Sequence, residues 1–218
     1  MRSRAWFATA AVPIAFVIAV VLMGAGNPVA DMPLTTQGAR TGEVSFGDLA
    51  TDALCDEAGT AIAFMPAVAF KTGTIKTGPF NLAAVARLLQ MPSENWAVSS
   101  LKGQQIKAAL ERSLSRLPLP SGAFLQVSGL TVAYDPNAPR NHRIKQILVA
   151  GAPLDEAKTY EVAMPVSLAK GGAGYFQIFD AKNIVRQGSK GLAQVIFDFA
   201  KKRGHVSYTG QGRIVPTG

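Results

Sequence analysis

Helical and strand-like patterns are intermixed along residues 43–218, and this order restricts the fold classes open to the chain. The clearest helical pattern is KGQQIKAALERSLSRL, residues 102–117. A second, FGDLATDALCDEA, covers residues 46–58 and ends before Gly59, a residue typical of helix C-termini. A third lies in SKGLAQVIFDFAKKRG, residues 189–204, where Lys201, Lys202 and Arg203 complement the C-terminal end of the helix dipole.

Strand-like runs fill much of the space between these helices. AIAFMPAVAF (61–70) indicates a buried strand running into a proline turn, and NWAVSSL (95–101) a further strand. NLAAVARLLQ (81–90) indicates a short amphipathic helix that Asn81 can cap. Because no strict βαβ repeat is visible, the pattern predicts a single α+β domain with a mixed sheet flanked by helices. Three strand-like runs broken by turn residues fill the middle of the second half, namely FLQVSGLTVAYDP (124–136), HRIKQILVAGAPL (142–154) and TYEVAMPVSLA (159–169).

An uncharged, apolar run extends from Ala5 to Ala25 and follows Arg2 and Arg4. A run of this length is close to the roughly 20 residues that cross a bilayer. We expect residues 1–26 to be an uncleaved signal anchor, or alternatively a cleaved signal peptide, residues 27–42 to be a linker, and residues 43–218 to be the domain. Arginines on the leading side only predict export of the rest. The expected location is therefore the inner membrane with the domain in the periplasm or outside, or a soluble periplasmic or secreted protein after cleavage.

The polar residues exclude several classes of site. The lone Cys55 cannot close an internal disulfide, and no histidine lies near it in sequence to activate it as a nucleophile. His142 and His205 are the only histidines, and neither lies in a recognisable metal motif. The net charge of +8 is not concentrated among aromatic residues, and the basic segment RNHRIK (140–145) follows a turn-rich stretch typical of a solvated hairpin tip. We therefore predict no catalytic residue, metal, cofactor or nucleic-acid partner.

The order of several segments resembles one known family. These segments are GDLATDAL (47–54), LKGQQIKAALERSL (101–114), FLQVSGLTVAYDP (124–136), VAGAPLDEAKTYEVAM (149–164), LAKGGAGYFQIF (168–179) and GRI (212–214). Together they look like the C-terminal domain of the bacterial periplasmic 5′-nucleotidase and UDP-sugar hydrolase family. The resemblance implies that hydrolysis belongs to a separate metallophosphatase domain with two metals, while the C-terminal domain holds the nucleoside between two aromatic rings and meets the phosphate with arginines.

Several positions depart from the pattern that this resemblance implies. The family's Pro-Phe-Gly-Asn motif falls on Met91–Glu94, and Ser167 stands where the second ring is expected. Lys71 stands where the family has an arginine. In the segment KGGAGYF (170–176), called the glycine loop below, Ala173 stands where the family has an acidic residue. The candidate ligand contacts that remain are Lys71, Gly171, Gly172 and Tyr175. Trp96, Phe70 and Phe80 are expected to pack in the core.

Three interpretations follow from these residues. The first is a non-catalytic accessory or structural subunit, anchored in the membrane and associated with a membrane protein complex. The second is the substrate-binding half of a split 5′-nucleotidase-type hydrolase in nucleotide catabolism, active only with a separate metallophosphatase and binding a nucleotide-like molecule. The third is a binding module for another small ligand.

Overall fold

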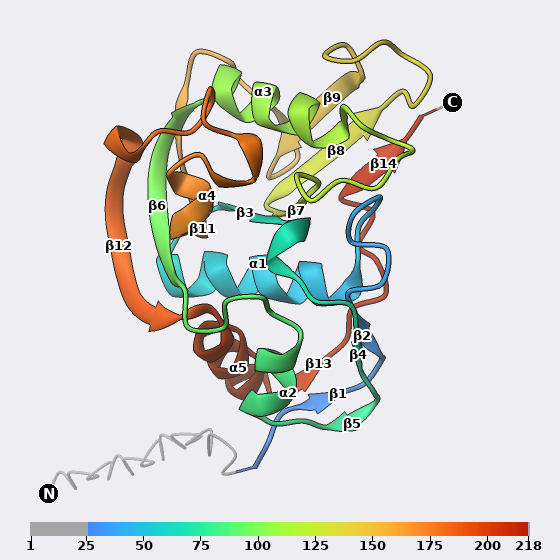
Figure 1. Cartoon of the computed structure of the whole chain (residues 1–218), viewed down its shortest axis with the longest axis vertical. Coiled ribbons are helices and arrows are strands. Elements are labelled where there is room, and N and C mark those ends of the chain that lie inside the picture. The colour runs from blue at the N-terminus through green and yellow to red at the C-terminus, as the bar shows by residue number, and fades with distance from the viewer. Residues whose placement is uncertain (1–25, 218) are drawn as a thin grey trace, which may run out of the picture.

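The computed structural model describes residues 26–217, which form an α+β fold of four β-sheets, five α-helices and three short 3₁₀ turns (Figure 1). The expected fold class is therefore confirmed. The predicted N-terminal apolar helix falls on residues outside the described range. Within the described range, no helix combines the length and the apolar character needed to cross a membrane.

The largest sheet has five strands in the order β12-β6-β11-β3-β7. Its strands are β3 (Ile62–Pro66), β6 (Asn95–Lys102), β7 (Leu125–Ser128), β11 (Thr159–Pro165) and β12 (Ile184–Gly191). Only β11 and β3 are parallel, and every other neighbouring pair is antiparallel. The sheet is thus mixed, as the intermixed sequence pattern predicts.

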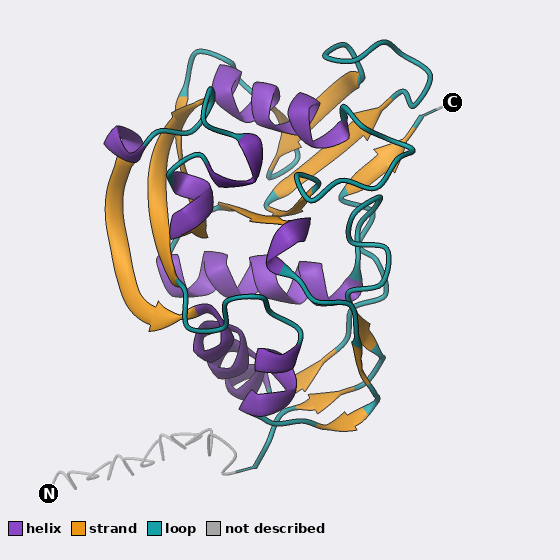
Figure 2. Cartoon of the chain, viewed as in Figure 1, coloured by secondary structure: helices purple, strands orange, loops and turns teal. Residues whose placement is uncertain are grey.

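Helices cover this sheet from both sides (Figure 2). The helices are α1 (Ser45–Ala58), α2 (Leu82–Arg87), α3 (Gly103–Leu114), α4 (Val166–Ala169) and α5 (Leu192–Arg203), and the 3₁₀ turns are η1 (Ala67–Ala69), η2 (Gly172–Gly174) and η3 (Ala181–Asn183). Gly59 ends α1 in the left-handed conformation, and the Asn81 side chain accepts a hydrogen bond of 2.9 Å from the Ala84 N–H at the start of α2. Both predicted helix signals are confirmed.

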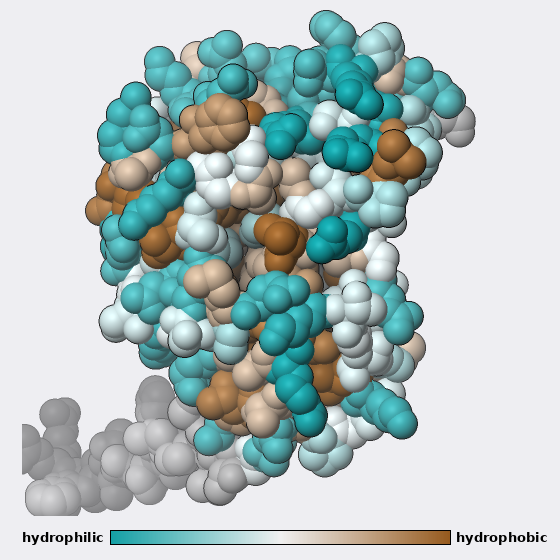
Figure 3. All heavy atoms as spheres, viewed as in Figure 1, coloured by the Kyte–Doolittle hydropathy of each residue, from teal (hydrophilic) through white to brown (hydrophobic). Residues whose placement is uncertain are grey.

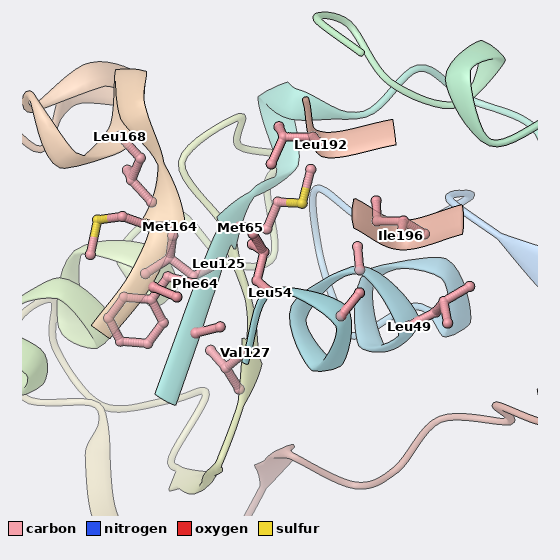
Figure 4. Close-up of a cluster of buried hydrophobic side chains, with 14 of the residues drawn as sticks. Leu49, Leu54, Phe64, Met65, Leu125, Val127, Met164, Leu168, Leu192 and Ile196 are labelled. Carbon is pink, nitrogen blue, oxygen red and sulfur yellow. The ribbon is translucent and has the colours of Figure 1, made fainter. Parts of the chain in front are cut away.

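The core lies on both faces of β3, because successive side chains of a strand point to opposite sides. Figure 4 shows Phe64 and Met164 on one side of the sheet and Met65 on the other, near Leu54 of α1 and Leu192 of α5. On the first side, the Phe64 ring stacks on Phe179 with centroids 6.4 Å apart. Trp96, Phe70 and Phe80 are buried, as expected.

Residues 27–42, expected to be a linker, are part of the folded domain. Within this segment, β1 (Val29–Ala30) pairs with β5 (Gly78–Pro79) and β13 (His205–Val206), and β2 (Leu34–Thr35) pairs with β4 (Thr74–Ile75). Leu34 is fully buried. Strands of two residues are too short for a periodic pattern, so only their long-range partners define them.

A four-stranded sheet forms the remaining part of the fold. It has the order β10-β9-β8-β14, and its strands are β8 (Leu130–Tyr134), β9 (Ile144–Val149), β10 (Ala152–Pro153) and β14 (Ile214–Pro216). The basic segment 140–145 enters β9, and its Arg140 and His142 are exposed as expected. Arg143 differs: it is buried and donates hydrogen bonds of 2.7 and 2.9 Å to the carbonyls of Leu114 and Leu117, at and just beyond the C-terminus of α3.

Candidate ligand site at the ends of the parallel strands

The end of β3 brings the segments singled out from the sequence to one edge of the sheet. Because β3 and β11 are parallel, η1 and α4, which follow them, leave the sheet at the same edge. The start of β6 lies there too, since Trp96 pairs with Pro165 at the end of β11. The carboxyl ends of parallel strands are a common place for ligand sites in open α/β sheets. In this chain the η1 turn separates two hollows.

The first, the apolar hollow, has a volume of about 300 Å³. It is lined by Pro66, Val68, Ala69, Gln90, Met91, Glu94, Ser167 and Leu192. Val68 and Met91 form part of its rim, with 43% and 57% of their surfaces exposed. On the face drawn in Figure 3, hydrophobic side chains occur in small groups among hydrophilic ones.

A hydrogen bond joins the two sides of the apolar hollow. The Ser167 N–H at the start of α4 donates to Oε1 of Glu94 over 2.7 Å. The hollow therefore brings together residues of the Met91–Glu94 segment and Ser167, the positions at which the resemblance to the family implies an aromatic ring with an amide and a second ring. Among the residues that the structure describes, 26–217, no aromatic side chain lines it.

The second, the basic hollow, has a volume of about 230 Å³ and lies on the other side of η1. Its lining contains Arg40 and Lys71 as cations, with Thr36, Gly38, Ala39, Thr41, Ala67, Phe70, Thr72 and Pro120. The Lys71 backbone is fixed by hydrogen bonds, since its N–H donates to Leu88 O over 2.9 Å and its carbonyl accepts from Thr36 Oγ1 over 2.7 Å. Within residues 26–217, neither cation takes part in an ion pair.

Sequence reasoning found Lys71 but missed Arg40. Arg40 lies in the segment interpreted as a linker, and no periodic pattern marks it. The one signal available was a single arginine between small and polar residues, GARTG (38–42), just before a helix. Its contribution to the hollow comes from the fold, which joins residues 36–41 to the end of β3.

The structure places Tyr175, one of the expected ligand contacts, inside the core. The Tyr175 ring is fully buried and stacks on Phe179 with centroids 5.1 Å apart. Its hydroxyl donates a 2.6 Å hydrogen bond to Ala123 O, and burial raises the pKa of this hydroxyl. No part of Tyr175 is therefore free to contact a ligand.

The two glycines selected as candidate contacts have the same structural explanation. Gly171 adopts φ 87°, and a Cβ there would meet Phe176 Cα at 2.6 Å. A Cβ on Gly172 would meet the Ser167 carbonyl at the same distance. Neither glycine lines one of the two hollows. Phe176, which follows Tyr175, has an exposed side chain, at 72%.

An ionic cluster lies away from the hollows and joins the C-terminal segment to α1. Arg213 lies 2.9 Å from Asp52 Oδ1 and donates a 2.8 Å hydrogen bond to Val127 O. Its Nε lies 3.6 Å from Oδ1 of the fully buried Asp48, whose two oxygens have no hydrogen-bond partner within residues 26–217. Burial raises the pKa of the Asp48 carboxyl to about 8, although Arg213 lowers it.

The other polar candidates do not form a catalytic group in the described part of the chain. Burial raises the pKa of the Cys55 thiol, which favours its neutral, weakly nucleophilic form. His205 is exposed and lies 2.8 Å from Asp31. Among residues 26–217, no group of three or more His, Cys, Asp or Glu side chains has the arrangement of a metal site.

Comparison with known proteins gives one consistent result. The chain is 33% identical over 199 residues to a 5′-nucleotidase-related protein of Glossina morsitans morsitans, covering 80% of this chain and 35% of the relative. It is 31% identical over 123 residues to a snake venom 5′-nucleotidase of Naja atra, covering 53% of this chain and 23% of the relative. The chain thus spans about a quarter to a third of the length of these curated relatives.

A solved structure and a family model agree with these relatives. The crystal structure of a 5′-nucleotidase precursor from Thermus thermophilus superposes with a TM-score of 0.78 and 30% identity, over 89% of this chain and 40% of that one. The family model described as 5′-nucleotidase, C-terminal domain, matches residues 21–181, most of the chain. The chain therefore belongs to the 5′-nucleotidase C-terminal domain family.

Proposed function

We propose that this chain is a non-catalytic accessory or structural subunit built on a 5′-nucleotidase C-terminal domain, which supplies a binding surface and no hydrolytic chemistry. The lining of the apolar hollow carries the proposal. The resemblance implies a base held between two rings at this place, whereas here the lining contains Met91, Glu94 and Ser167. Since aromatic pairs contribute about 0.5–1.5 kcal/mol beyond the area that they bury, a purine loses that gain on both faces.

The absence of suitable metal ligands in the described residues supports the same role. Hydrolysis with two metals needs a cluster of ligands that clamps both the attacking and the leaving oxygen. Residues 26–217 contain no such cluster. We further propose that residues 5–25 anchor the chain in the inner membrane and that the domain is exported, because that run is uncharged and long enough to span a bilayer.

The basic hollow favours a second candidate function. Arg40 and Lys71 form no ion pair among residues 26–217, so both can meet an anion, and guanidinium forks suit phosphate oxygens. This supports a substrate-binding half of a 5′-nucleotidase-type hydrolase that acts in nucleotide catabolism together with a separate metallophosphatase. The replaced lining of the apolar hollow counts against it.

Two measurements on the full chain test these roles. In the first, the detergent-solubilised chain is assayed on AMP and on a UDP-sugar with Mn²⁺ or Zn²⁺. We expect no turnover, and metal-dependent turnover by the pure chain would overturn the non-catalytic proposal. In the second, the protein is purified from gently solubilised membranes and its partners are identified by mass spectrometry, where a metallophosphatase would favour the split hydrolase and a membrane assembly the accessory role.

A matched pair of variants distinguishes the two candidates further. If AMP raises the Tm of the wild-type chain but not of the Arg40→Ala, Lys71→Ala double variant, the basic hollow binds phosphate and the second candidate gains support. The control is Arg87→Ala, Lys76→Ala, which removes two exposed cations from a separate hollow near α2.

A further inference from the structure

We propose that the apolar hollow binds a primary alkylammonium group, with its carbon chain on the apolar lining and its charge on Glu94. This inference builds on the proposed loss of the nucleobase clamp and names the chemistry that replaces it. The ammonium belongs either to a small amine or to a lysine side chain of a partner protein.

The shape and composition of the hollow favour a short apolar chain. Five of its eight lining residues are apolar, and they come from three separate segments, at Pro66–Ala69, Met91 and Leu192. Van der Waals contact with these side chains releases water from apolar surface on both partners. Met91 and Val68 at the rim are exposed, so the alkyl chain of a ligand can contact both side chains from solvent.

The charge of the hollow favours a cation. Among residues 26–217, Glu94 is the only ionisable residue in its lining. Oε1 accepts the Ser167 N–H, whereas no hydrogen bond within residues 26–217 reaches Oε2. No ion pair of Glu94 occurs in that range either. An ammonium group supplies the missing donor, and charge-assisted hydrogen bonds are stronger than neutral ones.

The same features disfavour an anion or a nucleotide at this place. A phosphate in the hollow would meet the Glu94 carboxylate, and the cations of the neighbouring basic hollow lie on the other side of η1. The two hollows therefore differ in the sign of the ligand that they suit. A lysine-like group, with four methylenes and one ammonium, matches both properties of the apolar hollow.

The Ser167 amide is a direct reporter for this proposal, because its N–H donates to the carboxylate in question. The full ¹⁵N-labelled chain in a non-ionic detergent is titrated with n-butylammonium, and the Ser167 cross-peak is followed by NMR. We expect a saturable shift at Ser167 and its neighbours, and a much smaller effect from 1-butanol, which has the same chain without the charge. An equal response to both compounds would overturn the proposal.

Two variants separate the contribution of the Glu94 charge from that of the apolar contact with the ligand's carbon chain. Glu94→Gln keeps an acceptor for the Ser167 N–H but removes the charge, and we expect at least about tenfold weaker binding. Met91→Ser alters an exposed side chain and should weaken binding about threefold. The matched control, Glu161→Gln, removes an exposed carboxylate on β11 and should bind as the wild type does. Unchanged affinity in Glu94→Gln would overturn the proposal.

Further titrations identify the source of the ammonium. Binding of Nα-acetyl-lysine methylamide at least as tightly as n-butylammonium assigns the site to a lysine of a partner protein, and binding of the free amine alone assigns it to a small molecule. A Ser167 shift with AMP but not with the amine contradicts this inference while leaving the hydrolysis assay unaffected. Metal-dependent turnover, in contrast, contradicts the proposed function without touching the amine titration.

Discussion

The hydroxyl of Tyr175 donates a 2.6 Å hydrogen bond to the carbonyl of Ala123, which fixes the glycine loop against the segment leading into β7. Arg112 of α3 reinforces the contact, since its guanidinium carbon lies 5.7 Å from the Tyr175 ring centroid and its Nε donates to Gly174 O over 2.8 Å. The buried side chain of Tyr175 thus holds the glycine loop against the core. Its glycines allow this close approach, since a Cβ on Gly174 would meet the Arg112 side chain.

Tyr175→Phe should destabilise the protein by about 1–3 kcal/mol, because it leaves the buried Ala123 carbonyl without its partner. Urea unfolding of the full chain measures the change. Phe176→Ala, next to it but 72% exposed, serves as the control and should stay within about 0.5 kcal/mol of the wild type. Equal losses in the two variants would contradict the structural role of Tyr175.

Gly171→Ala should also destabilise the fold, by about 1–3 kcal/mol, because its φ of 87° is strained for a residue with a Cβ. The added Cβ would also meet the Phe176 backbone at 2.6 Å. Thermal unfolding provides the measurement. Unchanged stability together with altered ligand binding would contradict this structural role and would support Gly171 as a ligand contact.

Arg213→Met should cost about 3–5 kcal/mol, because it leaves the Asp52 carboxylate without its cation and removes the positive charge that faces the buried Asp48 acid. The double variant Arg213→Met, Asp48→Asn should recover part of this loss, since it removes one of the two stranded acids. A double-mutant cycle in urea gives the coupling energy. Additive losses would show that the two side chains do not interact.

The stability of the wild type should fall as the pH rises from about 4 to about 8, relative to Asp48→Asn. Burial raises the pKa of folded Asp48 to about 8 from its ordinary 3.8, so the folded state keeps a proton that the unfolded chain has already lost. The contribution is fully favourable below pH 4 and is lost by pH 8. Urea unfolding of both proteins at pH 5, 6, 7, 8 and 9 tests this, and parallel curves would contradict it.

Long periodic elements were predictable because the hydrogen-bond partners of a helix are close in sequence, or because apolar side chains recur along one face of the element. The helices α1, α3 and α5 and the buried strand β3 lie where the apolar spacing and the cap residues indicate. The two-residue strands of segment 27–42 carry no such repeat. Their pairing with residues 74–79 and 205–206 is a property of the fold alone.

The candidate site was predictable only in part. Alignment with the family motifs singled out Met91–Glu94, Ser167 and Lys71, and these residues do lie at the two hollows. The same reasoning selected Tyr175 and Gly171, because a glycine-rich loop next to an aromatic residue is typical both of a ligand loop and of a tightly packed turn. Burial decides between the two, and burial depends on neighbours more than 50 residues away, such as Ala123.

The sequence by itself determined the fold class, the family and which residues stand where the family's two rings are expected, because each rests on residue identity and order along the chain. Only the tertiary structure decided which of the residues at the family's motif positions lie in the same hollow. The pairing of β11 with β3 and with β6 brings η1, α4 and the start of β6 to one edge, where Glu94 Oε1 lies 2.7 Å from the Ser167 N–H across 73 residues of sequence. It also places Arg40 with Lys71 and apart from Glu94, since the η1 turn divides the edge into two hollows of opposite charge.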